Sequence, residues 1–169
     1  LKLKELQKKD HILKKGMSVL DLGSFPGGWS QVSKELVGKT GKVVGVDLQE
    51  MKAVEGTSFI HKSIIDLKAK DFENTILPFD IVLSDMAPNI SGIQDRDNSQ
   101  MINLLDKVEN SIENFLKTGG STIIKVFQGD SLDHAKMFIK DHFMEVKIRK
   151  PNSSRPNSNE TYILGINLK

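Results

Sequence analysis

The chain has 169 residues, a formal net charge of +2 and no cysteine. This length predicts one domain, residues 1–169, with room for a sizeable core, and the lack of cysteine excludes disulfide bonds and cysteine-based metal sites and favours a reducing compartment. No apolar run reaches the roughly 18 residues that a membrane-spanning helix needs, and the four scattered histidines lack the spacing of metal ligands, so we expect neither a membrane span nor a metal site.

Apolar residues recur along the chain with the spacing of helices in some segments and of strands in others. In chain order the pattern predicts a helix at 2–13, a strand at 17–23, a helix at 28–37, strands at 42–47, 58–61 and 78–84, a helix at 98–116, a strand at 121–127, a helix at 132–142 and strands at 143–149 and 161–168. Gly119 and Gly120 are expected to end the long helix. The polar segment 150–159, with two prolines, is expected to be a loop. Strands that alternate with helices indicate an α/β fold, with a mostly parallel sheet covered on both faces.

Two basic segments lie near the ends of the chain. Residues 1–15, the N-terminal basic helix, carry a balance of +4, residues 144–156 carry +3, and the remainder carries −5. Such an arrangement suggests a local anionic partner, with nucleic acid as the first candidate. Two solvated lysine-rich surfaces would explain the same charges.

The loop after the first strand, within DLGSFPGGW at residues 21–29, is rich in glycine. It lacks both the G-x-G-x-x-G fingerprint of dinucleotide sites and the ending of a P-loop. Asp47 ends the second strand 24 residues after Gly23, where a carboxylate can accept both hydroxyls of a ribose. A nucleoside without a pyrophosphate, such as S-adenosylmethionine, fits both facts, since glycines allow close approach to the backbone. A tight turn with a capping aspartate would also account for them.

Four segments of the sequence carry a resemblance to a known family. DLGSFPGGWSQ, SDMAPNISG, IIKVFQGD and KPNSSRPNSNETYI resemble, in this order and spacing, the FtsJ-like (RrmJ/RlmE) ribosomal-RNA 2′-O-methyltransferases. The similarity covers essentially the whole chain. It implies a Rossmann-like methyltransferase fold, with a seven-stranded sheet whose last strand is antiparallel. It also implies S-adenosylmethionine as methyl donor and a ribose 2′-hydroxyl of RNA as acceptor, for which we expect a uridine of large-subunit ribosomal RNA.

The resemblance further implies a catalytic tetrad of Lys2, Asp85, Lys125 and Glu160. Lys125 lies in an otherwise apolar strand, where a lysine is costly unless it is paired or functional, and we expect it to be the general base. Asp85 follows a strand and can hold an ammonium group, and Glu160 can position the second lysine. Taken singly, each has an ordinary explanation as a surface lysine, a turn-capping aspartate or a solvated strand residue.

The remaining site residues follow from the same motifs and from the charge pattern. For the cofactor we expect contacts from Gly23, Gly27, Gly28, Trp29, Asp47 and Asp85. Many relatives carry an aspartate that meets the adenine; here Ser63 occupies that position, and Asp66 could substitute for it. Trp29 could equally pack the first helix. For RNA we expect contacts from Lys4, Lys8, Arg149, Lys150 and Arg155.

Other functions would use the same fold. A 2′-O-methyltransferase for transfer RNA or an mRNA cap would use the same tetrad, and a non-catalytic RNA-binding subunit should have lost some of its members. An amino-methyltransferase would favour an Asn/Asp-Pro-Pro-aromatic loop, whereas this loop reads Asp85-Met86-Ala87-Pro88. We expect a monomer that acts on ribosomal RNA within the large ribosomal subunit in the cytoplasm. Since the chain begins at Leu1, a missing targeting segment could instead direct it to an organelle such as the mitochondrion.

Overall fold

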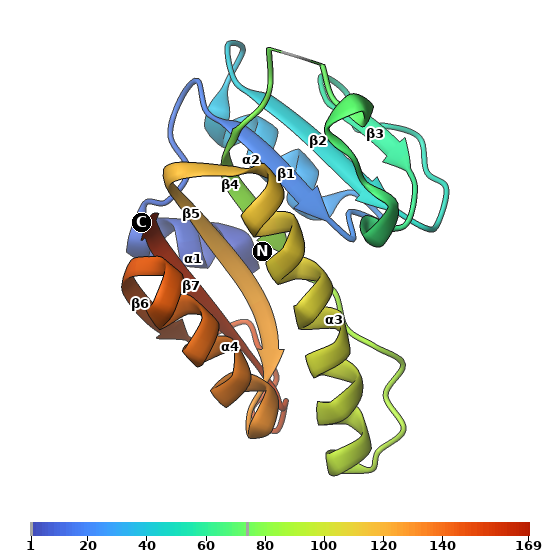
Figure 1. The fold of residues 1–169 in the computed structure, drawn as a ribbon, viewed down its shortest axis with the longest axis vertical. Helices are drawn as coiled ribbons and strands as arrows, with labels where there is room; N and C mark the ends of the chain where they lie inside the picture. Colours follow the sequence, from blue (N-terminus) through green and yellow to red (C-terminus); the bar gives the residue numbers. More distant parts are fainter. Residues whose placement is uncertain (1, 74) are drawn as a thin grey trace.

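A computed structural model describes residues 2–73 and 75–169. Its seven-stranded sheet has the order β3-β2-β1-β4-β5-β7-β6, with helices on both faces (Figure 1). The strands are β1 (Ser18–Leu22), β2 (Lys42–Asp47), β3 (Ser58–His61), β4 (Phe79–Ser84), β5 (Leu116–Phe127), β6 (Phe143–Arg149) and β7 (Glu160–Leu168). The helices are α1 (Lys2–Asp10), α2 (Gly28–Val37), α3 (Gln94–Phe115) and α4 (Asp130–His142), with short 3₁₀ turns η1 (Ile64–Asp66) and η2 (Ala69–Asp71). The predicted methyltransferase-type sheet is confirmed.

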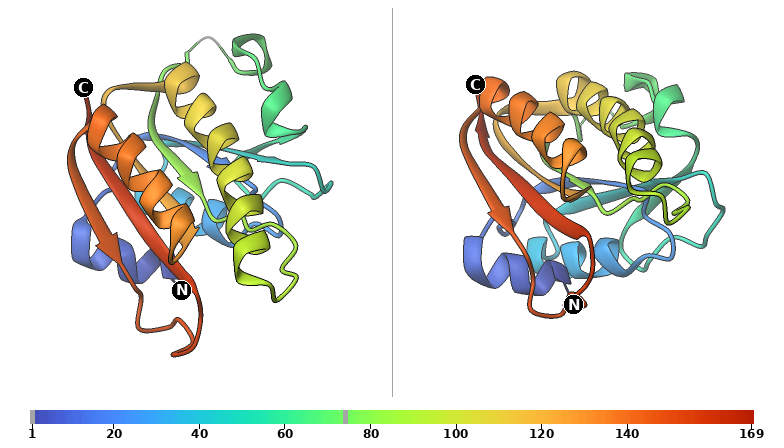
Figure 2. Two further views of the ribbon diagram at one scale, coloured as in Figure 1. Left: turned by 60° about the horizontal axis from the view of Figure 1, so that its bottom comes forward. Right: turned by 90° about the horizontal axis from the view of Figure 1, so that it is seen from below.

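The sheet is buried on both faces because its strands point alternate side chains into two apolar layers. Leu20 and Leu22 of β1 pack with α3 and α4, whereas Val19 packs with α1 and α2. Figure 2 shows α1 and α2 on one side of the sheet and α3 and α4 on the other. Among the residues that the structure describes, no helix has the length and apolar character needed to cross a bilayer.

The first five strands of the chain run parallel, and β7 runs antiparallel between β5 and β6. The carboxyl ends of β1, β2, β4 and β5 therefore share one edge of the sheet. Because β7 is reversed, its first residue reaches the same edge, where Glu160 lies opposite Phe127 and Tyr162 lies opposite Lys125. This topology collects the ends of five strands around one site.

The structure differs from the predicted boundaries at both ends of α3. The helix begins at Gln94, earlier than expected, and ends at Phe115, while β5 continues from Leu116 through the two glycines. Leu116 pairs with Phe79 and Ser121 with Ile81, so five residue steps on β5 match two on β4. Gly119 has a φ of 85°. The glycines therefore form a bulge within a strand and do not end a helix.

The N-terminal helix is shorter than predicted and is docked by charge. It ends at Asp10, since His11 has a φ of 51°, and Leu1 of the predicted basic helix lies outside the described residues. The Asp10 side chain is only 2% exposed, and both of its oxygens accept hydrogen bonds from the Arg149 guanidinium at 2.9 Å. These bonds and the charges of Arg149 and Lys147 hold the pKa of Asp10 below its usual value despite its burial. The pair attaches α1 to β6.

Replacing Arg149 by alanine should destabilise the fold, because it leaves a buried carboxylate without its partner. We expect the free energy of unfolding at pH 7 to fall by about 2 kcal/mol. The folded-state pKa of Asp10 lies below its unfolded value of 3.8, so the pair stabilises the fold above that pH and loses its effect as the pH falls further. Urea denaturation at pH 7 and near pH 3.5 should therefore show a smaller cost of Arg149→Ala in acid. Arg155→Ala is the control. If both variants lower the free energy of unfolding equally at pH 7, Arg149 does not have this role.

Candidate active site

The four residues of the predicted tetrad meet at the carboxyl edge of the sheet. Lys125 Nζ lies 3.5 Å from Asp85 Oδ1 and 3.3 Å from Glu160 Oε2. Lys2 Nζ lies 3.5 Å from Glu160 Oε1. The order in space is thus Lys2, Glu160, Lys125, Asp85, with each carboxylate beside an ammonium group. Lys125 is the most buried member, with 11% of its side chain exposed.

Opposite charges lie side by side in the tetrad, and their attraction offsets the free-energy cost of placing them in a half-buried site. Burial disfavours ionisation of Glu160, but the charges and hydrogen bonds of Lys125 and Lys2 outweigh it and hold the pKa of that carboxyl below its usual value. Glu160 is therefore a carboxylate near neutral pH, able to hold both lysines. The predicted role of Glu160, to position the second lysine, agrees with this geometry.

Tyr162 is a site residue that the sequence analysis missed. Its hydroxyl donates a hydrogen bond of 2.7 Å to Asp85 Oδ1, and its side chain is fully buried. Burial and the negative charge of Asp85 raise the pKa of the phenol above its usual value, so Tyr162 stays protonated and donates. A residue two positions after Glu160 on a strand points to the same face, and this spacing could have identified it.

Trp29 packs against Tyr162 in the apolar layer beneath α1 and α2. The ring centroids are 5.7 Å apart with an interplanar angle of 27°. Trp29 is not among the described residues that line the cavity discussed next. Its placement corresponds to the packing alternative and makes it a support for the hydroxyl that holds Asp85.

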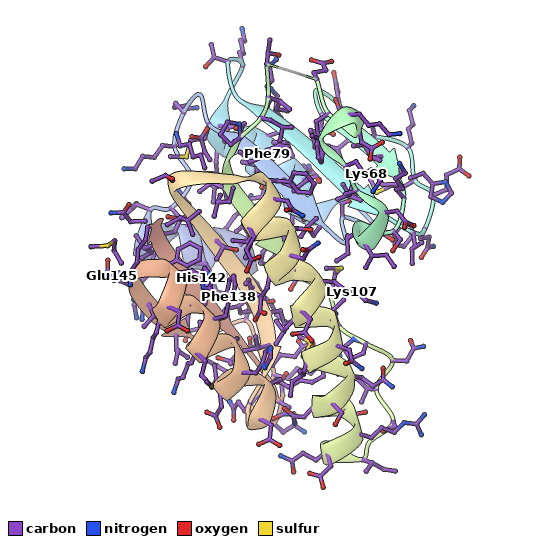
Figure 3. The ribbon with its side chains drawn as sticks, in the orientation of Figure 1. Lys68, Phe79, Lys107, Phe138, His142 and Glu145 are labelled. Carbon is purple, nitrogen blue, oxygen red and sulfur yellow. The ribbon has the colours of Figure 1, made fainter. Side chains whose placement is uncertain are left out.

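A cavity of about 460 Å³ opens beyond the carboxyl ends of β1, β2 and β4. It shares Asp85 with the tetrad, and it combines carboxylates, lysines and apolar side chains. Its lining comprises Gly23, Phe25, Asp47, Leu48, Lys62, Ser63, Ile64, Asp85, Met86, Ala87, Pro88, Gln100, Asn103, Leu104 and Lys107. Lys107, labelled in Figure 3, reaches this cavity from α3.

The glycine loop has the conformation that glycine alone adopts easily. Gly23 and Gly27 have φ values of 71° and 116°. A Cβ at Gly23 would overlap the side chain of Met86, which lines the cavity, and one at Gly27 would lie 2.8 Å from Val54 Cγ2. Gly28 begins α2 and faces open space. Of the three glycines, Gly23 alone lines the cavity in the described structure.

Two backbone amides hold the Asp47 carboxylate in place, one from the glycine loop and one from the segment after β2. Its Oδ2 accepts a hydrogen bond from the Phe25 amide at 2.9 Å, and its Oδ1 accepts one from the Gln49 amide at 2.8 Å. The capping alternative is thus present, yet each carboxylate oxygen retains a lone pair that can accept a ribose hydroxyl. Ser63 also lines the cavity, whereas Asp66 is exposed in η1 and is not among the described lining residues. The geometry therefore favours Ser63 over Asp66 near an adenine.

The chemistry of this lining fits S-adenosylmethionine. Asp47 and Asp85 are acceptors for ribose hydroxyls and for an ammonium group, and the backbone at Gly23 can be approached closely. Ile64 and Leu104 supply apolar surface for a base.

A second cavity, of about 660 Å³, lies on the other side of the tetrad. Its lining comprises Lys2, Ile90, Asp97, Phe127, Ser153, Arg155, Asn157, Ser158, Asn159 and Glu160. Asp97 accepts hydrogen bonds from Ser91 N (2.8 Å), Ser91 Oγ (2.7 Å) and Gly92 N (3.1 Å), and so fixes the loop that leads from Asp85 to α3. The tetrad thus connects two cavities, with Asp85 in one and Lys2 and Glu160 in the other.

The two basic segments come together beside this second cavity. In both views of Figure 2 the start of α1 lies beside the loop that joins β6 and β7. A further cavity of about 450 Å³ between them is lined by Lys8, Lys9 and Lys150, among others. Lys150 Nζ donates to the carbonyl oxygen of Ser158 at 2.6 Å, so it orders the loop.

The other three predicted RNA contacts differ in how available their side chains are to bind RNA. Lys4 makes an exposed ion pair with Glu35 at 3.7 Å, and Arg155 lines the second cavity. Arg149, by contrast, is bound to Asp10. Lys4, Lys8 and Arg155 are therefore the better probes of an RNA surface.

Asp21, in the strand before the glycine loop, is an acid buried within the fold. It is 1% exposed, its Oδ2 accepts a hydrogen bond of 2.7 Å from Ser30 Oγ, and its Oδ1 accepts none from the described residues. Burial, together with the charges of Asp85 and Asp47, raises the pKa of Asp21 to about 7. The carboxyl therefore exchanges its proton near neutral pH.

Asp21→Asn should change how stability depends on pH. Between the unfolded pKa of 3.8 and the folded pKa of about 7, the folded state binds more protons at Asp21, so wild-type stability falls as the pH rises. The variant lacks this loss. From pH 4 to pH 8 we expect the unfolding free energy of Asp21→Asn to rise relative to that of the wild type by roughly 2–4 kcal/mol. Denaturant titrations at both pH values measure it, and a pH-independent difference would contradict the assignment.

Known proteins resemble the chain over nearly its whole length. A family model described as FtsJ-like methyltransferase matches residues 1–168. The ribosomal RNA large subunit methyltransferase E of Methylobacillus flagellatus is 39% identical over 98% of this chain and 81% of the relative. A solved structure from Plasmodium falciparum, described as a ribosomal RNA methyltransferase, is 28% identical with a TM-score of 0.85, covering 99% of this chain and 94% of that one. A methyltransferase-like protein of Streptococcus mutans in complex with SAH shares the fold, at 16% identity and a TM-score of 0.60, over 94% of this chain and 90% of that one.

Proposed function

Since the chain belongs to the FtsJ-like methyltransferase family, we propose that it transfers a methyl group from S-adenosylmethionine to a ribose 2′-hydroxyl of large-subunit ribosomal RNA. The observation that carries the proposal is the contact of Lys125 with both Asp85 and Glu160, between a cavity suited to the donor and a second cavity open to an acceptor. A uridine is the proposed nucleotide, and the assembled large subunit is the proposed form of the substrate.

The residues have two tasks in this reaction, to hold the donor and to accept a proton. When bound, S-adenosylmethionine supplies a methyl group on a positively charged sulfur and leaves as S-adenosylhomocysteine. Asp47 and Ser63 would hold its nucleoside part, and such binding would orient the donor for the reaction. Lys125 Nζ accepts the proton of the attacking 2′-hydroxyl.

Lys125 has to be neutral when it accepts that proton. Its ammonium proton therefore leaves to solvent before the reaction, while Asp85 and Glu160, both within 3.5 Å of Nζ, hold the amine in position. Tyr162 keeps Asp85 oriented toward Lys125. Lys2, bound to Glu160, faces the acceptor cavity and supplies a positive charge for a phosphate or hydroxyl of the RNA.

A non-catalytic RNA-binding role is disfavoured, because all four tetrad residues are present and in contact. The relative named above comes from a bacterium, and its own name refers to ribosomal RNA. This supports a substrate in the cytoplasm. A monomer is proposed on the grounds that the site is built from one chain.

Lys125→Met keeps the apolar stem of the side chain and removes the amine. We expect turnover to fall by about 10²–10⁴-fold, with the affinity for S-adenosylmethionine nearly unchanged. Asp47→Ala is the matched variant: its affinity for S-adenosylmethionine should weaken by about 1–3 kcal/mol, the scale of lost hydrogen bonds to a charged group. Labelled-methyl transfer and titration calorimetry measure the two effects. If Lys125→Met keeps more than about a tenth of wild-type turnover, Lys125 is not the base.

The basic residues around the second cavity should bind RNA phosphates. Lys4→Ala, Lys8→Ala and Arg155→Ala should each lower the slope of log affinity against log salt concentration by about 0.7–0.9. They should weaken different RNAs alike, since phosphate contacts position the RNA without reading its sequence. Lys39→Ala, which removes an exposed lysine at the opposite edge of the sheet, is the control. Slopes equal to wild type in all three variants would move the RNA to another face.

The form of the substrate is tested by offering the enzyme naked large-subunit RNA, large ribosomal subunits and transfer RNA in parallel. Faster labelling of ribosomal RNA or subunits supports the proposal, and the ratio between them identifies the substrate. Labelling of transfer RNA alone would overturn it.

A further inference from the structure

Where α3 and α4 pack together, acids on one helix face histidines on the other. Asp106, Glu109 and Glu113 lie on α3 at the spacing of one helix face. His134 and His142 lie on α4, where Figure 3 labels His142 beside Phe138. The sequence showed no ligand spacing among the histidines because this cluster forms between two helices.

Three possible ligand atoms of this cluster lie close together. His134 Nε2 is 3.0 Å from Asp106 Oδ1 and 3.5 Å from Glu109 Oε1, and all three atoms lie within 4.8 Å of one another. A tetrahedral zinc ion with bonds of about 2.0–2.1 Å separates its ligand atoms by about 3.3–3.4 Å. The two distances from the imidazole nitrogen lie on either side of this value, so an ion fits after small side-chain movements.

Glu109 is the most buried of the three ligands, with 15% of its side chain exposed. Its Oε1 is buried and accepts no hydrogen bond from the described residues, although it faces His134 Nε2 at 3.5 Å. A buried carboxylate oxygen is costly unless a donor or a cation compensates it. Asp106 and His134, at 59% and 34% exposed, lie toward the solvent, so an ion can enter and water can complete its coordination.

We propose that Asp106, Glu109 and His134 bind a divalent transition-metal ion of the Zn²⁺ class, which links α3 to α4. An imidazole together with carboxylates suits Zn²⁺, whereas Mg²⁺ and Ca²⁺ prefer oxygen ligands alone. His134 binds the ion through Nε2 and carries its proton on Nδ1. The site lies apart from the tetrad and does not rest on the proposed function.

The test uses the full chain after treatment with a chelator, titrated with ZnCl₂ by calorimetry. We expect one ion per chain, a higher thermal midpoint with Zn²⁺ than without, and no comparable effect of MgCl₂. His134→Ala and the isosteric Glu109→Gln and Asp106→Asn should weaken Zn²⁺ binding by at least about 10–100-fold. Co²⁺ gives a second readout, because four-coordinate Co²⁺ absorbs visible light strongly.

The control is His11→Asn, which replaces an exposed histidine in the turn after α1 and should leave Zn²⁺ binding unchanged. Circular dichroism establishes whether each variant is folded. If His134→Ala does not fold, the Zn²⁺ affinities of Glu109→Gln and Asp106→Asn test the site. Absence of stoichiometric Zn²⁺ binding by the wild type overturns the proposal. So does binding that persists in the folded variants, which would place the ion elsewhere.

Discussion

The charge of Lys125 within an apolar strand is the constraint on which the rest of this structure depends. An ammonium group at this depth is stable only with carboxylates beside it, and the chain supplies two, from different strands. Asp85 follows β4, and Glu160 reaches the same edge because β7 runs against its neighbours. The reversed strand is therefore as important to the site as the glycine loop.

The supporting contacts extend outward from that charge. Tyr162 holds Asp85 and is itself covered by Trp29, while Glu160 holds Lys2 at the start of α1. Such a shell lets a site orient reacting groups without rearrangement during the reaction.

Much of this could be predicted from the sequence, where strong local patterns coincide with the structure. The helix at 28–37 and the strands at 42–47, 58–61 and 143–149 have the expected bounds. The motifs also contain Asp85, Lys125 and Glu160, which the structure places in contact. The prediction that Gly119 and Gly120 end a helix is wrong, because a bulge depends on the register with β4. Three other features depend on contacts between distant segments: the bond of Tyr162 to Asp85, the ion pair of Asp10 with Arg149, and the ion pair of Glu109 with His134. No local period encodes these contacts.

The attachment of α1 has a mechanical consequence. Asp10 fixes the helix to β6 at one end, and Lys2 lies at the other, about 12 Å away at the rise of an α-helix. A tilt of the helix about this ion pair would therefore move Lys2. A tilt of about 5° would displace Lys2 by roughly 1 Å, and a displacement of this size can slow an enzyme about 100-fold. Glu5, which accepts a hydrogen bond of 3.1 Å from the Ser153 amide, restrains this tilt from a position partway along α1. Contacts remote from Lys2 in this way set the accuracy with which the first turn of α1 places it beside Glu160.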